Sequence, residues 1–182
     1  MANLSDEELM QLVQRGELNK ARLLFDRYQV RIYNYCLQLS GDRETSKDLT
    51  QEVFYKLLKF RSTYQSPLFV TWLYTIARNL CYDHYKARRK ADRQIAEFRR
   101  FAERSRVEVT DAPGDLNQLA YALQQLPLPD RELIVMSKYQ GMRYREIAAI
   151  TNATEGTVRT RTHRALRKLR TIYFANVSKH EL

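Results

Sequence analysis

The chain has 182 residues, of which five are Gly and four are Pro, and its 31 Lys and Arg outnumber its 21 Asp and Glu for a net charge of +10. So few turn formers exclude a β-sandwich or β-barrel, which needs a turn about every 8–12 residues. The 12 Tyr and 7 Phe exclude a wholly disordered chain. The excess of positive charge indicates a polyanionic partner, and nucleic acid is the first candidate.

Apolar residues recur at helical spacing through the first 90 residues. Ser5 and Glu8 have the pattern of a capping box that begins a helix, and Gly16 ends it. Further helices are predicted at 21–40, 44–60 and 68–90. Residues 62–67 are predicted to form a loop, because Pro67 disfavours helical backbone at the residue before it.

The second half of the chain is also helical in pattern. Residues 91–115 mix five Arg with six acidic residues and end in Asp-Ala-Pro-Gly-Asp, which predicts a flexible linker containing one helical stretch. Helices are predicted at 117–126, 131–139, 144–150 and 157–174. The expected fold is therefore all-α, with two small helical domains (1–90 and 116–182) joined by the linker 91–115. The domains carry net charges of +5 and +6 and the linker −1, which indicates two separate contacts with one polyanion.

No metal, cofactor or secretion signal is predicted. Cys36 and Cys81 lie in helical patterns without a CxxC motif, which favours two reduced, buried thiols. The acidic N-terminus lacks the apolar core of a signal peptide, and the longest charge-free stretch, 62–77, is too polar to span a membrane. A soluble intracellular protein is expected.

Residues 144–158 have the spacing of a helix-turn-helix motif. Ala148 allows a close helix crossing, Asn152 tolerates the left-handed turn, and Thr154 can cap the following helix. One face of that helix is apolar, and the other carries side chains that read base edges or bind phosphates: Arg159, Thr160, His163 and Arg164. The alternative is a solvated basic face. Six basic and no acidic residues between 159 and 170 favour DNA binding.

The predicted helix at 68–90 has two faces. Its apolar stripe includes Trp72, for which core packing is the favoured interpretation. A second stripe combines aromatic, polar and basic side chains and is followed by a basic end that suits phosphate: Thr71, Tyr74, Thr75, Arg78, Asn79, Tyr82, Lys86 and Arg88 to Lys90. Bases stack on rings and the backbone meets positive charge on such a face, so it suits single-stranded DNA. Core packing is an equal alternative for Tyr74 and Tyr82.

The predicted helix at 44–60 carries an acidic and polar patch on its non-apolar face, formed by Asp48, Gln51, Glu52 and Tyr55. DNA would avoid this patch, so it favours a protein partner, with a plain solvated face as the alternative.

Four motifs together resemble the extracytoplasmic-function (ECF) sigma factors of the bacterial sigma-70 family. They are Asp48-Leu-Thr-Gln-Glu-Val-Phe54, Thr71-Trp-Leu-Tyr-Thr-Ile-Ala-Arg-Asn79, Leu126-Pro127 followed by Asp130-Arg131, and Tyr144-Arg-Glu-Ile-Ala-Ala149 with Gly156-Thr-Val-Arg-Thr-Arg161. The resemblance covers nearly the whole chain outside the linker, and the order and spacing of the four motifs make it specific.

The resemblance implies a non-enzymatic protein of the bacterial cytoplasm, without cofactor, that binds core RNA polymerase, recognises the −35 and −10 promoter elements, melts the −10 region and directs transcription initiation. By this analogy the first domain docks on the clamp helices of the largest polymerase subunit through Asp48, Gln51 and Glu52, and the second contacts the flap of the β subunit. Single-stranded −10 DNA would meet Tyr74, Arg78, Asn79, Tyr82, Lys86, Arg88 and Arg89. Double-stranded −35 DNA would meet Arg159, Thr160, His163 and Arg164. Many family members bind an anti-sigma factor, and whether this chain does stays open.

The sequence leaves two alternative functions. A helix-turn-helix repressor or activator with a sensing domain accounts for the second half, but not for the acidic patch or the aromatic and basic face. A nuclease would need clustered carboxylates for metal ions or a His general base, whereas His84, His163 and His180 share no motif.

Overall fold

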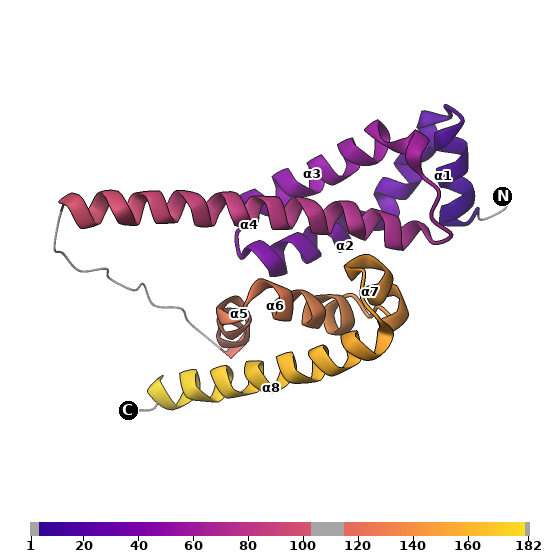
Figure 1. The fold of residues 1–182 in the computed structure, drawn as a ribbon. Coiled ribbons are helices and arrows are strands. Elements are labelled where there is room, and N and C mark those ends of the chain that lie inside the picture. Colours follow the sequence, from indigo (N-terminus) through magenta and orange to yellow (C-terminus); the bar gives the residue numbers. More distant parts are fainter. Residues whose placement is uncertain (1–3, 103–114, 181–182) are drawn as a thin grey trace.

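The computed structural model describes residues 4–102 and 115–180, with side chains described for 4–95 and 118–177. Regular structure in these ranges is entirely helical and forms two bundles that lie against each other (Figure 1). The N-terminal bundle comprises α1–α4, and the C-terminal bundle comprises α5–α8. The expected all-α fold with two helical domains is confirmed.

The N-terminal bundle contains α1 (Asp6–Gln14), α2 (Ala21–Ser40), α3 (Arg43–Lys59) and α4 (Phe69–Ala102), with single 3₁₀ turns at Leu18–Lys20 and Arg61–Thr63. The predicted capping box is present at the start of α1, where the Glu8 amide donates to Ser5 Oγ at 3.1 Å and the Ser5 amide donates to Glu8 Oε2 at 2.7 Å. Gly41 ends α2 in the left-handed conformation at φ 74°, which a residue with a Cβ adopts only at a cost. The helix ends therefore follow local sequence signals.

Side chains of α1 form hydrogen bonds with the backbone of the loop before α4 and with the first residue of α4. The Phe69 amide donates to Glu7 Oε1 at 2.9 Å, and Gln14 Nε2 donates to the carbonyls of Ser62 and Tyr64, each at 3.2 Å. These contacts satisfy backbone groups that have no partner within the helix itself. They fix where α4 begins.

Helix α4 is longer than the sequence predicted. It spans 34 residues to Ala102 and includes 91–102, a segment that the sequence places in the predicted linker. Between Phe69 and Ala102 there is neither Gly nor Pro, so nothing in the backbone interrupts the helix. Figure 1 shows α4 continuing beyond the ends of α2 and α3. Residues 103–114, and the side chains of Phe98 and Phe101, lie outside the described part.

The C-terminal bundle contains α5 (Asp115–Gln125), α6 (Leu128–Ile134), a π-helical turn at Val135–Tyr139, α7 (Tyr144–Thr151) and α8 (Glu155–His180). Helix α6 begins three residues earlier than predicted because Pro129 lies in its first turn, where the missing amide costs nothing. The core of the C-terminal bundle is formed by residues that are nearly inaccessible to solvent, such as Leu123, Ile134, Ile147 and Val158.

Buried side chains of the two bundles form one continuous apolar cluster. Cys36 and Cys81 are buried in it, as predicted, with the Cys81 thiol donating to Cys36 Sγ at 3.8 Å. None of the described helices combines the length and the apolar composition that a membrane span requires.

Candidate nucleic-acid interface

The helix-turn-helix motif forms as predicted. Asn152 ends α7 with φ 50°, and the Thr157 amide donates to Thr154 Oγ1 at 3.2 Å, so Thr154 caps the first turn of α8. Ala148 and Val158 are buried where α7 and α8 pack together. The turn therefore fixes the angle at which α8 leaves the bundle.

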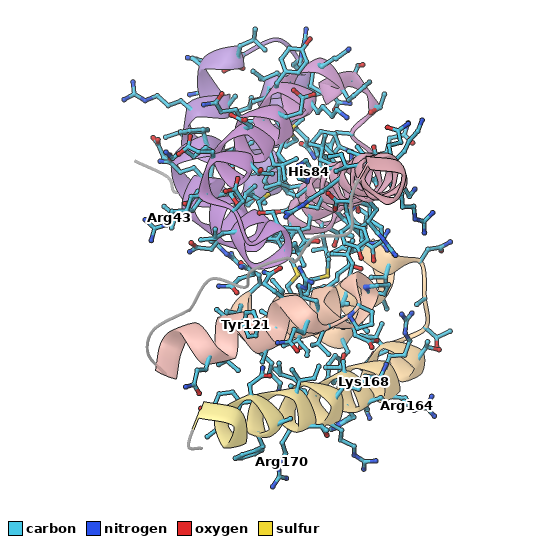
Figure 2. All side chains as sticks on the ribbon, turned by 90° about the vertical axis from the view of Figure 1, so that its left-hand side faces the viewer. Arg43, His84, Tyr121, Arg164, Lys168 and Arg170 are labelled. Atoms are coloured by element: carbon cyan, nitrogen blue, oxygen red, sulfur yellow. The ribbon has the colours of Figure 1, made fainter. Side chains whose placement is uncertain are left out.

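The predicted DNA-binding side chains of α8 lie on its exposed face. Arg159, Thr160, His163 and Arg164 are all exposed, whereas Val158, Thr162 and Ala165 are buried on the opposite face. Arg159 forms an ion pair with Glu155 at 3.4 Å, and both side chains are more than half exposed. An exposed ion pair contributes little free energy, so Arg159 can exchange it for a contact with a phosphate. Figure 2 shows Arg164 and Arg170 extending from α8 away from the N-terminal bundle.

A shallow hollow lies at the start of this face and adds residues that the sequence prediction did not include. It is lined by Thr154, Gly156, Thr157, Thr160, Arg161 and Arg164. Arg161 is exposed beside the predicted residues and extends the cationic surface. Its place in a run of six basic residues is the signal that could have identified it.

The residues of α4 that were predicted to bind single-stranded DNA fall into an exposed group and a group covered by the C-terminal bundle. Asn79, Lys86, Arg88 and Arg89 are exposed. By contrast Tyr74 is fully buried, and its hydroxyl donates to Gln140 Oε1 at 2.7 Å. Burial raises the pKa of this tyrosine to about 12. Of the two alternatives that the sequence leaves open for Tyr74, this arrangement has the packed one, with its ring 5.2 Å from that of Tyr35 of α2.

Arg78 and Tyr82 are half-buried and meet a carboxylate of the C-terminal bundle. Arg78 Nε and the Tyr82 hydroxyl each donate to Glu132 at 2.7 Å, and the Arg78 guanidinium lies 4.4 Å from the centre of the Tyr82 ring. Glu132 is 2% exposed. Burial raises its pKa, and the charge of Arg78 and the hydroxyl of Tyr82 oppose that rise.

Trp72 is half-buried and packs against other aromatic rings, in line with the predicted core role. Its ring centroid lies 5.2 Å from that of Tyr64 and 6.5 Å from that of Phe69. The Tyr64 and Trp72 rings pack edge to face and the Phe69 and Trp72 rings are tilted, and these aromatic contacts support the first turns of α4 and the loop before it.

The acidic and polar patch on α3 is exposed as predicted. Asp48 and Gln51 are exposed, Glu52 is half-buried, and Tyr55 is 57% exposed. Asp42 caps the same helix, with Oδ2 accepting from the Thr45 amide at 2.7 Å. Hydrogen bonding by the Thr45 side chain, followed by that of its amide, lowers the pKa of the Asp42 carboxyl. Within the described residues no group of three side chains is arranged to hold a metal ion.

Comparison with known proteins covers most of the chain. A family model for Sigma-70 region 2 matches residues 24–91, and a model for Sigma-70 region 4 matches residues 116–169. The chain is 30% identical over 148 residues to RNA polymerase sigma factor CarQ of Myxococcus xanthus, covering 81% of this chain and 85% of CarQ. It is 32% identical over 167 residues to ECF RNA polymerase sigma factor BldN of Streptomyces coelicolor, covering 89% of this chain but only 63% of BldN.

Solved structures share the fold at lower identity. CnrH, in complex with the cytosolic domain of CnrY, has a TM-score of 0.70 and 23% identity over 92% of this chain and 96% of CnrH. The sigma factor RpoE of Bartonella quintana, in complex with the anti-sigma factor NepR, has a TM-score of 0.64 and 24% identity over 83% of this chain and 94% of RpoE.

Proposed function

Because this chain belongs to the ECF sigma factors of the sigma-70 family, which direct transcription initiation and are not enzymes, we propose that its two bundles bind the two promoter elements separately. The C-terminal bundle, region 4, binds the −35 duplex, and the N-terminal bundle, region 2, binds the −10 element as a single strand. Membership of this family excludes the repressor and nuclease alternatives. The observation that carries the proposal is the exposed cationic face of α8, which is the second helix of the helix-turn-helix and is capped by Thr154.

For the −35 element, we propose that α8 enters the major groove. Arg159 and Arg164 are placed to donate to guanine or to phosphate, and Thr160 and His163 lie between them on the same exposed face. The hollow lined by Gly156, Thr157 and Arg161 lies at the start of this face, and a phosphate of the same DNA would be bound there by Arg161.

For the −10 element, the outer face of α4 supplies Asn79 and Lys86, both exposed, with Arg88 and Arg89 further along the helix. Arg78 stacked on Tyr82 offers a ring and a cation together, which is the combination that holds unstacked bases. Capturing a base repays part of the few kcal/mol that its unstacking costs. Melting would therefore depend on the sequence that is melted.

For polymerase, we propose that Asp48, Gln51 and Glu52 dock on the clamp helices of the largest subunit and that region 4 contacts the β flap. The exposed carboxylate of Asp48, the half-buried carboxylate of Glu52 and the exposed ring of Tyr55 support a protein contact on an otherwise basic molecule. The protein would then act in the bacterial cytoplasm, where polymerase is found.

An anti-sigma factor is a further proposed partner. CnrH and RpoE were each solved with a bound partner, and these two proteins share the fold of this chain.

The test is transcription in vitro from a library of random upstream sequences, with core bacterial RNA polymerase and with or without this protein. We expect initiation that requires the protein, and one shared pair of upstream motifs in the DNA that was transcribed. Initiation without any shared motif would contradict two-element recognition.

A further inference from the structure

Two thiols that the proposed function does not use lie in contact inside region 2. The chain has two cysteines, and they are 45 residues apart, Cys36 on α2 and Cys81 on α4. Both are free thiols, and the Cys81 thiol donates to Cys36 Sγ at 3.8 Å. Two sulfurs in contact on neighbouring helices are placed to form a disulfide, whose S–S bond is about 2.05 Å long.

The residues where α2 and α4 meet allow the close approach that a disulfide needs. Ala77 lies one turn before Cys81 on α4 and is fully buried, as is Cys36. Because these side chains are small, they leave the two helix backbones room to lie close together. The two sulfurs have to approach by roughly 1.8 Å to bond. Rotation of the two short side chains, with a small shift of one helix, covers that distance.

The two thiols differ in their access to solvent, and this difference sets the order in which they react. Cys36 is fully buried, whereas Cys81 is 5% exposed and borders a cavity of about 600 Å³. His84 and Arg88 of α4 line the same cavity, so its wall is partly polar. A small polar oxidant such as hydrogen peroxide can therefore reach Cys81, but not Cys36.

We propose that Cys36 and Cys81 are an oxidisable pair, which hydrogen peroxide converts into an intramolecular disulfide between α2 and α4. Peroxide first oxidises the Cys81 thiol to a sulfenic acid and releases one water. The Cys36 sulfur then attacks the Cys81 sulfur, the S–O bond breaks, and the hydroxyl leaves with the Cys36 proton as a second water. The two thiols together lose two electrons, and the O–O bond of the peroxide takes them up.

The surroundings of the pair make the first step slow and the second step fast. The hydrogen bond with Cys36 and burial raise the pKa of the Cys81 thiol, so little of it is present as the thiolate that attacks peroxide. Once Cys81 is a sulfenic acid, Cys36 is already in contact with it, and condensation precedes further oxidation. The pair therefore responds to sustained oxidation and not to a brief pulse.

The disulfide would stabilise region 2. It closes a loop from 36 to 81 that contains the whole of α3 and the loop before α4. A crosslink across such a loop lowers the conformational entropy of the unfolded chain, so the folded form is favoured. Region 2 would therefore become more resistant to unfolding under oxidising conditions, without any new contact on its surface.

The test begins with the full chain, treated with millimolar hydrogen peroxide for several hours. Free thiols are then alkylated after denaturation, and peptides are mapped by mass spectrometry, which separates a disulfide from oxidised methionine. We expect the Cys36 peptide joined to the Cys81 peptide within a monomer, and dithiothreitol should release both. The melting temperature should rise by about 5–15 °C on oxidation and return on reduction.

Two variants serve as matched controls. In Cys36→Ala the sulfenic acid at Cys81 has no partner, so a dimedone probe should label it or it should proceed to sulfinic acid. In Cys81→Ala the buried Cys36 should stay reduced under the same treatment. In neither variant should dithiothreitol change the melting temperature after peroxide treatment.

The wild-type chain alone can overturn the proposal, even if a variant fails to fold. Two unmodified thiols after peroxide treatment would show that the pair only fills the core. Sulfinic acid at Cys81 without a disulfide, or a disulfide that joins two chains, would show that the two thiols do not react with each other. A disulfide that leaves the melting temperature unchanged would overturn the effect on region 2.

Discussion

Replacing Arg131 by Ala tests how region 4 is held together. Arg131 is 5% exposed, and its guanidinium donates to the Leu126 carbonyl at 3.1 Å and to the carbonyl and side-chain oxygens of Gln124. These acceptors lie at the end of α5, so they lose their donor whether or not the bundles are in contact. The change therefore acts on region 4 itself.

Within region 4 the change leaves the carbonyls of Gln124 and Leu126 without this donor, and between the bundles it also removes the hydrogen bond from Arg131 Nη1 to the Leu39 carbonyl at 2.6 Å. The magnitude is worked from the two carbonyls within region 4. A buried acceptor without a partner costs about 1–3 kcal/mol, so two of them cost about 4 kcal/mol at the middle of that range. Burial lowers the pKa of Arg131, which means that the guanidinium itself loses hydration on folding, and removing it returns part of that cost. We expect the free energy of unfolding to fall by about 2–3 kcal/mol, or the melting temperature by about 4–10 °C for a chain of this size.

Urea and thermal denaturation followed by far-UV circular dichroism measure this change. Arg145→Ala, on the exposed surface of α7, is the matched control and should stay within about 0.5 kcal/mol of the wild type. Arg131→Lys keeps the charge but not the planar fork, so it should recover only part of the loss. A stability of Arg131→Ala equal to that of the Arg145 control would refute the role given to these hydrogen bonds.

Three further predictions concern the proposed surfaces. Arg164→Ala should weaken binding of the polymerase holoenzyme to a promoter by about 1–3 kcal/mol and relax the −35 preference if the side chain reads a base; an equal loss on all sequences in competition binding would make it a phosphate contact instead. Gln51→Ala combined with Glu52→Ala should weaken affinity for core polymerase and leave the circular dichroism spectrum unchanged, and full affinity would remove the docking assignment. Thr154→Ala should lower the free energy of unfolding by about 1 kcal/mol through loss of the cap on α8, and no change in urea denaturation would show that the cap contributes nothing.

Features with short-range causes could be predicted from the sequence. The capping box of Ser5, the left-handed Asn152 and the cap by Thr154 each depend on residues within three or four positions. The exposed faces of α8 and α3 could be predicted from helical periodicity, because the side opposite the apolar residues is the exposed one. The absence of Gly and Pro between 69 and 102 is a local signal that α4 continues to Ala102. The mixed charges of 91–102 are also typical of a linker, so the composition alone favours the shorter helix.

The polar contacts between the two bundles could not be predicted in this way. Glu132 and Arg78 are 54 residues apart, and Tyr74 and Gln140 are 66 apart, so no local pattern places them together. A stripe of Tyr and Arg at helical spacing suits solvent, nucleic acid or a polar interface equally well. For Tyr74 and Tyr82 this ambiguity is resolved only by knowing which helix of region 4 packs against α4.

Crosslinking tests the central claim, that two surfaces of this chain bind two promoter elements. A photoreactive amino acid replaces either Asn79 on α4 or His163 on α8, both exposed, and the holoenzyme is assembled on a promoter recovered from the library. The account predicts that the probe at position 79 labels the melted −10 strand and the probe at 163 labels the −35 duplex. Labelling of the same element from both positions, or of no DNA from either while initiation proceeds, would contradict it.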